Sequence, residues 1–253
     1  MRFVIESHEP LTQNVYHMRL SGDTRAIVRP GQFVQVQLPG FYLRRPISVC
    51  DWRPGEEGTL DLICKVVGLG TEAMSHYAAG TELDLLTGLG NGFDVDRLDE
   101  VTASQFPLLV GGGVGTPPLY GLCKKLLAEC KEPRVILGFN TAAEVFWQRE
   151  FEALGVPLTV TTADGTQGVK GFVTDAMVPL EGKYDYVYAC GPEPMLRAVH
   201  AVCERQDIHG QFSFEERMAC GFGVCMGCSC QTGYGSKRIC KDGPVLKREE
   251  ILW

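Results

Sequence analysis

The first part of the chain, up to about residue 95, consists of short apolar segments separated by glycine and proline. In residues 59–67 (TLDLICKVV), Leu60, Leu62 and Val66 fall on one side of a period of two, as expected of a strand with one buried face. Similar strands are expected at 33–38 (FVQVQL), 47–52 (ISVCDW) and 82–88 (ELDLLTG). Regularly spaced strands of this kind predict a small antiparallel β-barrel.

From about residue 105 the pattern changes to strands that alternate with helices. Apolar strands are expected at 106–110 (FPLLV), 134–139 (RVILGF), 157–163 (PLTVTTA) and 184–190 (YDYVYAC). Leu119, Leu122 and Leu126 recur at helical spacing, so a helix is expected from Pro117 to about Cys130, and a final helix from near Pro194. This alternation predicts a parallel sheet.

We therefore predict a β plus α/β fold in three parts: an antiparallel barrel (1–98), a parallel-sheet nucleotide-binding domain (99–209) and a small cysteine-rich domain (210–253). The formal charge of −7 argues against non-specific nucleic-acid binding, which needs a basic surface. No apolar stretch is long enough to span a bilayer, and the N-terminus lacks the features of a signal peptide. A cytoplasmic protein with no membrane contact is expected.

Cysteines near the C-terminus carry the most specific motif of the chain. Cys220, Cys225, Cys228 and Cys240 follow the C-x4-C-x2-C…C spacing of plant-type [2Fe–2S] ligands, and the intervening glycines leave room for the loop to wrap a cluster. A zinc site is the alternative, but its ligands usually come as two short cysteine pairs. Cys230 lies outside the spacing and is interpreted as a packed thiol. The nearby basic residues are either a docking edge or a solvated charged face; they are Lys237, Arg238, Lys241, Lys247 and Arg248.

A glycine-rich loop follows the strand at 106–110, where the next helix begins. Its backbone N–H groups can receive a pyrophosphate, although Thr116 stands where the dinucleotide fingerprint has its third glycine. A tight packing turn is the alternative interpretation. A second loop, Cys190-Gly191-Pro192, ends a later strand, where ligands of open α/β sheets bind. The nucleotide-binding candidates are Gly111, Gly112, Gly113, Gly115, Thr116, Gly191 and Pro192, with Cys190 as a catalytic candidate.

Two features of the first part suggest a flavin. Arg45-Pro46-Ile47-Ser48 opens a strand with a guanidinium that can pair with a phosphate, and Gly70 and Thr71 precede a short helical segment. A nicotinamide transfers two electrons and a [2Fe–2S] cluster one, so a chain with both needs a mediator such as a flavin. NAD(H) is expected over NADP(H), because Asn140 to Glu144 offers no cation to a 2′-phosphate.

The order of these motifs resembles the ferredoxin–NADP reductase superfamily, and within it the electron-transfer subunits of class 1B dihydroorotate dehydrogenase. The matching stretches are LRRPISV (43–49), GGGVGTPPL (111–119), ERMACGFGVCMGCSCQT (216–232) and CKDGPVL (240–246). Two departures are that Ile47 replaces the tyrosine of R-x-Y-S, and that the G-P-L-G-x-G-F turn reads TGLGNGF at 87–93.

The resemblance implies FAD, NAD and [2Fe–2S] binding by the three parts in order. It implies that Ser48 lies near flavin N5 as a catalytic candidate and that the FAD-lining residues are Arg45, Pro46, Ile47, Ser48, Ile63, Cys64, Lys65, Gly70 and Thr71. It further implies a hetero-oligomer, such as a heterotetramer, with an FMN-containing dihydroorotate dehydrogenase subunit that supplies electrons for NAD⁺ in pyrimidine biosynthesis. The alternatives are a reductase subunit of a hydrogenase or ferredoxin-linked transhydrogenase, and a zinc-stabilised interaction module.

Overall fold

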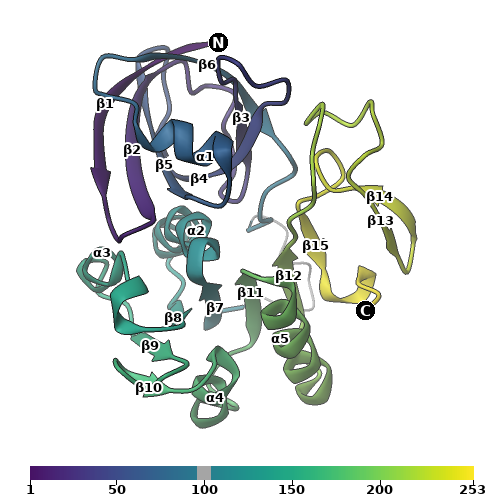
Figure 1. Cartoon of the computed structure of the whole chain (residues 1–253). Helices are drawn as coiled ribbons and strands as arrows, with labels where there is room; N and C mark the ends of the chain where they lie inside the picture. Colours follow the sequence, from purple (N-terminus) through teal and green to yellow (C-terminus); the bar gives the residue numbers. More distant parts are fainter. Residues whose placement is uncertain (96–103) are drawn as a thin grey trace.

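A closed antiparallel barrel forms the N-terminal part of the computed structural model, which describes residues 1–95 and 104–253. Its strands follow the order β1-β2-β5-β4-β3-β6, with bounds β1 (Arg2–Pro10), β2 (Val15–Gly22), β3 (Phe33–Val36), β4 (Arg45–Arg53), β5 (Gly58–Lys65) and β6 (Glu82–Leu89). Helix α1 (Leu69–Ser75) covers one side of the barrel between β5 and β6 (Figure 1). Phe3, Met18 and Leu60 are fully buried in its core, as the alternating pattern requires.

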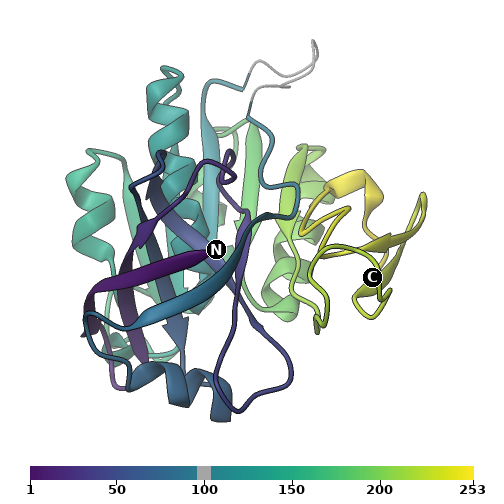
Figure 2. The same cartoon turned by 90° about the horizontal axis from the view of Figure 1, so that it is seen from above.

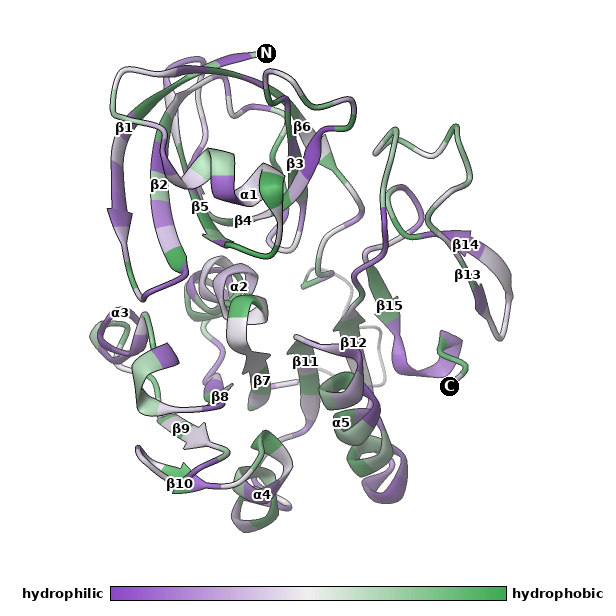
Figure 3. Ribbon diagram, viewed as in Figure 1, coloured by the Kyte–Doolittle hydropathy of each residue, from purple (hydrophilic) through white to green (hydrophobic). Residues whose placement is uncertain are grey.

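A seven-stranded sheet follows, in the order β10-β9-β8-β7-β11-β12-β15. Its elements are β7 (Pro107–Gly112), α2 (Thr116–Ala128), β8 (Arg134–Phe139), α3 (Gln148–Ala153), β9 (Leu158–Thr162), β10 (Val169–Lys170), α4 (Val173–Met177), β11 (Tyr186–Cys190), α5 (Glu193–Gln206), β12 (Gly210–Ser213) and β15 (Val245–Lys247). All pairs are parallel except β12 with β15. Every residue of β7 is buried, as expected for a central strand with helices on both faces. Figure 3 colours the same ribbon by hydropathy, with hydrophobic residues in green along the strands and helices. Short 3₁₀ turns lie at 113–115, 142–144, 178–180 and 248–250.

The C-terminal segment leaves this sheet after β12 and returns to it as β15. Between them lie the cysteine loop and a hairpin of β13 (Ser229–Thr232) and β14 (Gly235–Arg238). Figures 1 and 2 show this segment beside both the barrel and the sheet. Two of its strands, β12 and β15, thus belong to the sheet although they lie past residue 209. The division into three domains stays a prediction, and its first boundary, at 98/99, lies outside the described residues.

The barrel packs directly on helix α2. A Cβ at Gly121 of α2 would lie 2.8 Å from the carbonyl oxygen of Cys50 in β4, so only glycine allows this approach. At the same interface the His17 ring meets the Trp147 ring edge-on, with centroids 5.5 Å apart. This contact fixes the barrel relative to the sheet edge that carries the glycine loop.

Asp61, 4% exposed, forms hydrogen bonds with two side chains of β2 beside that interface, those of His17 and Arg19. His17 Nε2 lies 2.7 Å and Arg19 Nε 2.9 Å from Asp61 Oδ1. Burial alone would lower the pKa of His17, but the contacts with Asp61 and Glu9 raise it. Burial alone would raise the pKa of Asp61, whereas His17 and Arg19 lower it. None of the helices in the described ranges has the length and apolar character to cross a bilayer.

Candidate cofactor sites

A cavity of about 740 Å³ opens where the barrel, the carboxyl edge of the sheet and the C-terminal segment meet. Parallel strands end at this edge, so the loops after β7 and β11 converge there. The cavity brings together these predicted residues: Pro46, Ser48, Lys65, Gly112, Gly113, Gly115, Cys190, Gly191 and Pro192. Among the described residues that line it, Lys65 is the one cationic side chain.

Strand β4 presents alternate side chains to this cavity. Pro46 and Ser48 line it, and they are opposite Gln35 and Phe33 of β3 in the strand register. Ile47, between them, packs against the barrel core. Because successive side chains of a strand point to opposite faces, Ile47 cannot present its side chain beside Pro46 and Ser48.

Ile63 and Cys64 of β5 lie in apolar cores. Cys64 belongs to the barrel core, and Ile63 to the core between barrel and sheet. Burial raises the pKa of Cys64 to about 12, so its thiol stays neutral. The side chains of Ile63 and Cys64 contribute packing, so a cofactor would meet only the backbone at these two positions, whereas Lys65, at the end of β5, lines the cavity.

Arg45 lies against the first turn of α1. Its guanidinium lies 4.7 Å from the centroid of the Phe41 ring, and a Cβ at Gly70 would lie 2.1 Å from Arg45 Nε. Thr71 Oγ1 accepts from the backbone N–H of Val67 at 2.9 Å and so serves the turn itself. Gly70 therefore makes room for the guanidinium, a donor suited to a phosphate.

The glycine loop after β7 packs backbone to backbone on the loop after β11. A Cβ at Gly115 would lie 2.2 Å from the carbonyl oxygen of Cys190, and one at Gly191 would lie 3.1 Å from the backbone nitrogen of Gly112. Gly111 is more loosely enclosed, and its nearest atoms include Thr116 Oγ1, itself buried without a hydrogen-bond partner. These glycines allow the two loops to pack closely against each other. This requirement for glycine is separate from the glycine spacing of the dinucleotide fingerprint.

Cys190 ends β11 at the wall of the cavity. Its side chain is buried, which raises the pKa of the thiol to about 12 even though a hydrogen bond with Ser213 lowers it. The group is a neutral thiol at neutral pH, able to contact a ligand but unsuited to act as a thiolate. Ser213, at the end of β12, also lines the cavity.

Asn140 and Glu144 line the far end of the cavity, after β8. Asn140 Nδ2 donates to Glu144 Oε2 at 2.9 Å, which fixes the carboxylate. A carboxylate at this position suits a ribose hydroxyl and repels a 2′-phosphate. The geometry agrees with the preference for NAD(H) inferred from the sequence, which stays a prediction.

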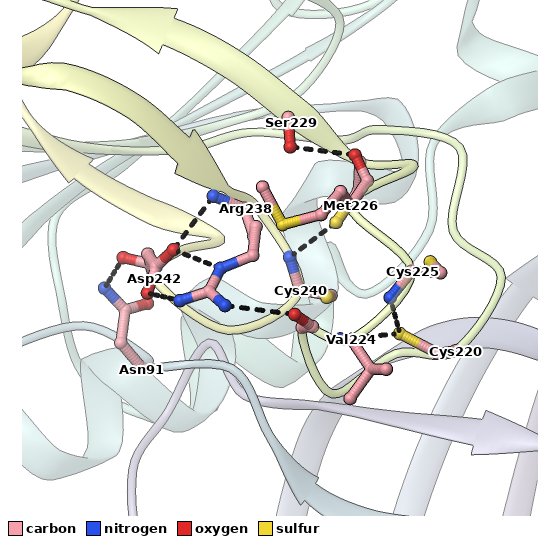
Figure 4. Close-up of polar contacts among 11 residues, drawn as sticks. Asn91, Cys220, Val224, Cys225, Met226, Ser229, Arg238, Cys240 and Asp242 are labelled. Atoms are coloured by element: carbon pink, nitrogen blue, oxygen red, sulfur yellow. Dashed lines mark hydrogen bonds and ion pairs between the residues drawn. The ribbon is translucent and has the colours of Figure 1, made fainter.

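The four predicted cluster cysteines form two hydrogen-bonded pairs, Cys220 with Cys225 and Cys228 with Cys240. Figure 4 labels Cys220, Cys225 and Cys240 on this loop. In the first pair, the backbone N–H groups of Val224 and Cys225 donate to Cys220 Sγ at 3.3 and 3.5 Å. Burial opposes ionisation of Cys220, yet the N–H groups of this loop, first that of Cys225, lower its pKa to about 6.

In the second pair, Cys240 N–H donates to Cys228 Sγ at 3.4 Å. Burial, followed by contact with Cys228, raises the pKa of Cys240 to about 12. No three His, Cys, Asp or Glu side chains among residues 1–95 and 104–253 form a set for a single metal ion. Two pairs of thiols fit a [2Fe–2S] cluster, whose four cysteines are divided between two irons.

Backbone shape in this loop also suits a wrapped cluster. Gly221 and Gly223 have φ of +79° and +87°, and a Cβ at either would lie 2.6 Å from Gln35 Nε2 or from Lys241 Cδ. Cys230 lies apart on β13, facing Lys237 in the register, and burial raises its pKa. The glycines are required, and Cys230 has the surroundings of a packed thiol.

Arg238 and Asn91 fasten the loop (Figure 4). Arg238 Nη1 donates to the Gly223 carbonyl at 3.0 Å while Nε donates to Asp242 at 2.9 Å. Asn91, in the turn after β6, donates through Nδ2 to the Val245 carbonyl at 2.7 Å and accepts from Val245 N–H at 3.1 Å. The turn TGLGNGF thus joins the barrel to the strand that follows the last cysteine.

Three of the basic residues near the cysteines, Lys237, Arg238 and Arg248, pair with carboxylates of the same chain. Lys237 Nζ lies 2.6 Å from Glu250, and Arg248 Nη2 lies 3.3 Å from Asp207. The structure favours the interpretation as a solvated charged face. The cysteine loop itself exposes three apolar side chains, those of Phe222, Val224 and Met226, with exposed fractions of 52, 73 and 53%.

Comparison with known proteins decides the family. A model of the iron–sulfur cluster binding domain of dihydroorotate dehydrogenase B matches residues 215–252, and an oxidoreductase NAD-binding domain matches residues 109–201. The chain is 39% identical to the electron transfer subunit of dihydroorotate dehydrogenase B (NAD(+)) of Geobacillus sp. (strain WCH70), over 99% of this chain and 98% of that protein. It belongs to this family of electron transfer subunits. The Fusobacterium nucleatum member is also 39% identical, over 98% and 96% of the two chains.

Solved structures agree with this placement in the family. A structure described as an NADH-dependent reduced ferredoxin–NADP oxidoreductase, studied for flavin-based electron bifurcation, superposes with a TM-score of 0.88 at 30% identity, over 99% of this chain and 89% of that chain. An Amycolatopsis cytochrome P450 reductase shares the fold, with a TM-score of 0.70 at 23% identity, over 81% and 66% of the two chains.

Several residues at these sites had no individual signal in the sequence. Phe33 lines the cavity and packs in the same core as Cys228 and Cys240. Gln35 is fully buried beside Gly221. Alternation in FVQVQL puts both on the outer face of the barrel, and only contact with the C-terminal segment makes that face an interior. Asn91 stands at the variable position of the G-P-L-G-x-G-F turn, so that pattern gives it no individual signal either.

Proposed function

We propose that this chain transfers electrons from an FMN-containing dihydroorotate dehydrogenase subunit, through a [2Fe–2S] cluster and FAD, to NAD⁺. The observation that carries the proposal is the arrangement around β3 and β4: the flavin motif, the nucleotide loops and the core containing Cys228 and Cys240 meet at this one place. Electron transfer between three cofactors needs such proximity. Family membership supports the same conclusion.

FAD is held by the barrel in this proposal. Arg45 pairs with its diphosphate, with Gly70 leaving the space, while Pro46 and Ser48 face the flavin from β4. Ile47, Ile63, Cys64 and Thr71 shape the site through packing and backbone, and Lys65 lines it with a cationic side chain. The flavin supplies an acceptor that exchanges one or two electrons.

NAD is held at the sheet edge by the loops at 111–116 and 190–192. The glycines present backbone N–H groups to the pyrophosphate. Cys190 and Ser48 line the same cavity, in which a nicotinamide must approach the flavin. Cys190 acts there as a neutral contact group, in keeping with its raised pKa.

The cluster is held by Cys220, Cys225, Cys228 and Cys240. Support comes from the two thiol pairs, from the N–H groups directed at Cys220 and Cys228, and from the glycines that clear the loop. Hydrogen bonds of this kind stabilise sulfur ligands that carry negative charge. The partner docks at the cysteine loop, where Phe222, Val224 and Met226 expose an apolar surface.

One experiment tests the whole proposal. The chain is purified without oxygen and analysed for FAD and iron, with about one FAD and two irons per chain expected. It is then mixed with the FMN-containing subunit, and NADH formation from dihydroorotate is followed. NADH should form only in the mixture, while the chain alone reduces an artificial acceptor with NADH. Stoichiometric zinc without flavin, or dihydroorotate oxidation by the chain alone, would contradict the proposal.

A ferredoxin-linked oxidoreductase subunit is the second candidate, favoured by the superposition with the NADH-dependent ferredoxin–NADP oxidoreductase. The same mixture distinguishes them. No gain in NADH formation with the dihydroorotate dehydrogenase subunit, together with ferredoxin-dependent NAD⁺ reduction, would favour the second candidate.

A further inference from the structure

Gln35 is a buried amide with nothing to bind. Its side chain is fully buried, and neither Nε2 nor Oε1 has a hydrogen-bond partner. An amide removed from water without a partner carries an energetic cost that folded proteins rarely accept. A buried amide of this kind therefore indicates either that a ligand binds to it or that the residue has a functional role.

Its surroundings indicate which group it serves. Gln35 lies on β3, opposite Pro46 of the proposed flavin strand, and a Cβ at Gly221 would lie 2.6 Å from Gln35 Nε2. Gly221 directly follows Cys220, so the amide is pressed against the cysteine loop. Glycine at 221, with φ of +79°, is what allows the barrel side chain to come this close.

The chemistry of the loop matches an N–H donor. Backbone N–H groups already point at Cys220 and Cys228, and a cluster with four thiolate ligands attracts further donors. The N–H groups that donate to Cys220 and Cys228 all belong to residues of the C-terminal segment. Gln35 would be the donor that comes from the barrel.

We propose that the Gln35 amide donates a hydrogen bond to the iron–sulfur centre and raises its reduction potential. This inference rests on the proposed function, because it requires that the four cysteines hold a cluster. The physical reason is that reduction adds an electron to the centre, so an N–H dipole directed at it stabilises the reduced form more than the oxidised form. Gln35 is a positioning and tuning residue, situated between the flavin strand and the cluster loop.

The test compares Gln35→Met with Gln37→Met in the cofactor-loaded full chain. Methionine keeps the length of the side chain and removes the donor. Gln37, two residues further along, is exposed and accepts from Arg44, so it is the matched control. Iron and FAD content are measured first, and the midpoint potentials of both groups are then obtained by titration followed by electron paramagnetic resonance and visible absorbance.

Gln35→Met should shift the ratio of oxidised to reduced cluster about tenfold at a fixed potential, which is about 59 mV towards more negative values for a one-electron couple. Gln37→Met should leave it unchanged. Gln35→Leu, which also lacks an N–H donor and introduces no ionisable group, should lower the potential by a similar amount and serves as the second variant if Gln35→Met does not fold.

An unchanged cluster potential in a loaded Gln35 variant would overturn the inference. So would a shift confined to FAD, since the amide would then serve the flavin. A wild-type chain without iron is a different result, because it contradicts the proposed function itself. If the wild-type chain holds its cofactors but the cluster potential is the same with and without the Gln35 amide, the proposed function stands and only the role of Gln35 is refuted.

Discussion

Asn91 joins the barrel to the segment that carries Cys240, the last of the predicted cluster cysteines, and Asn91→Ala should weaken this connection. The substitution removes the donor to the Val245 carbonyl at 2.7 Å, the longer one to the Asp242 carbonyl at 3.3 Å, and the acceptor of Val245 N–H at 3.1 Å. At about 1 kcal/mol net for each good hydrogen bond, and less for the long one, the loss is about 2 kcal/mol.

A loss of about 2 kcal/mol raises the opening equilibrium of this contact about 30-fold. Amide hydrogen exchange at Val245 reports that opening directly, and we expect its rate to rise by about this factor. Iron release to a chelator should accelerate in parallel, because the strand carrying Val245 follows Cys240 closely. Asn14→Ala, in an exposed turn, is the control. Unchanged exchange at Val245 would refute the reasoning, since it would mean that the backbone bond from Asn91 N–H to Gly243 suffices.

Three further predictions concern separate parts of the molecule. Cys230→Ser should keep the iron content, whereas Cys228→Ser should lose it, as measured by iron analysis and visible absorbance. Glu144→Gln should narrow the preference for NADH over NADPH in dye reduction, and an unchanged ratio would remove Glu144 from nucleotide selection. Stability from His17 should be fully present below pH 6.5 and be lost as pH rises through its raised folded pKa. Thermal unfolding at pH 6 and pH 8 should show this difference in the wild type and a smaller one in His17→Gln.

Strong periodicity made several elements predictable. The strand at 134–139 matches β8 residue for residue, and the helix expected from Pro117 begins at Thr116 and ends at Ala128 instead of Cys130. Its last turn ends early because Cys130 takes a left-handed conformation, with φ of 57°. Paired prolines mark where a helix begins, but no comparable residue marked where this one ends.

Other elements depend on partners that the sequence does not place. Strand β12, with only four residues, is completely buried because β11 and β15 flank it. The hairpin of β13 and β14 has no apolar alternation to reveal it. Strands β1 and β2 lay within the region expected to form a barrel, without separate bounds.

The candidate sites divide in the same way. Pro46, Ser48 and Cys190 belong to motifs with recognisable spacing, and the structure brings them to one cavity. Ile47 belongs to the same motif, yet the pleat of β4 turns its side chain to the barrel core. Gln35 is the opposite case. Its position in the strand suggests that its side chain is exposed, but Gly221, which is far away in the sequence, packs against it and buries it. Contacts of high sequence separation decide such cases, and local pattern cannot encode them.

The sheet explains why the cysteine loop needs fasteners on the barrel. Residues 214–244 form an excursion whose two ends meet in one strand pair, with Ser213 opposite Val245. This strand pair anchors the loop at its base, and the hairpin is also held by the C-terminal residues, where Thr232 pairs with Ile251 and Gly233 N–H donates to the Glu250 carbonyl at 2.8 Å. Barrel elements next to the proposed flavin strand add two contacts, from Asn91 to Val245 near the base and from Gln35 to Gly221 near Cys220. We therefore expect the separation between the proposed cluster and flavin sites to depend on the barrel as well, so substitutions at these barrel residues should alter electron transfer without touching a cysteine.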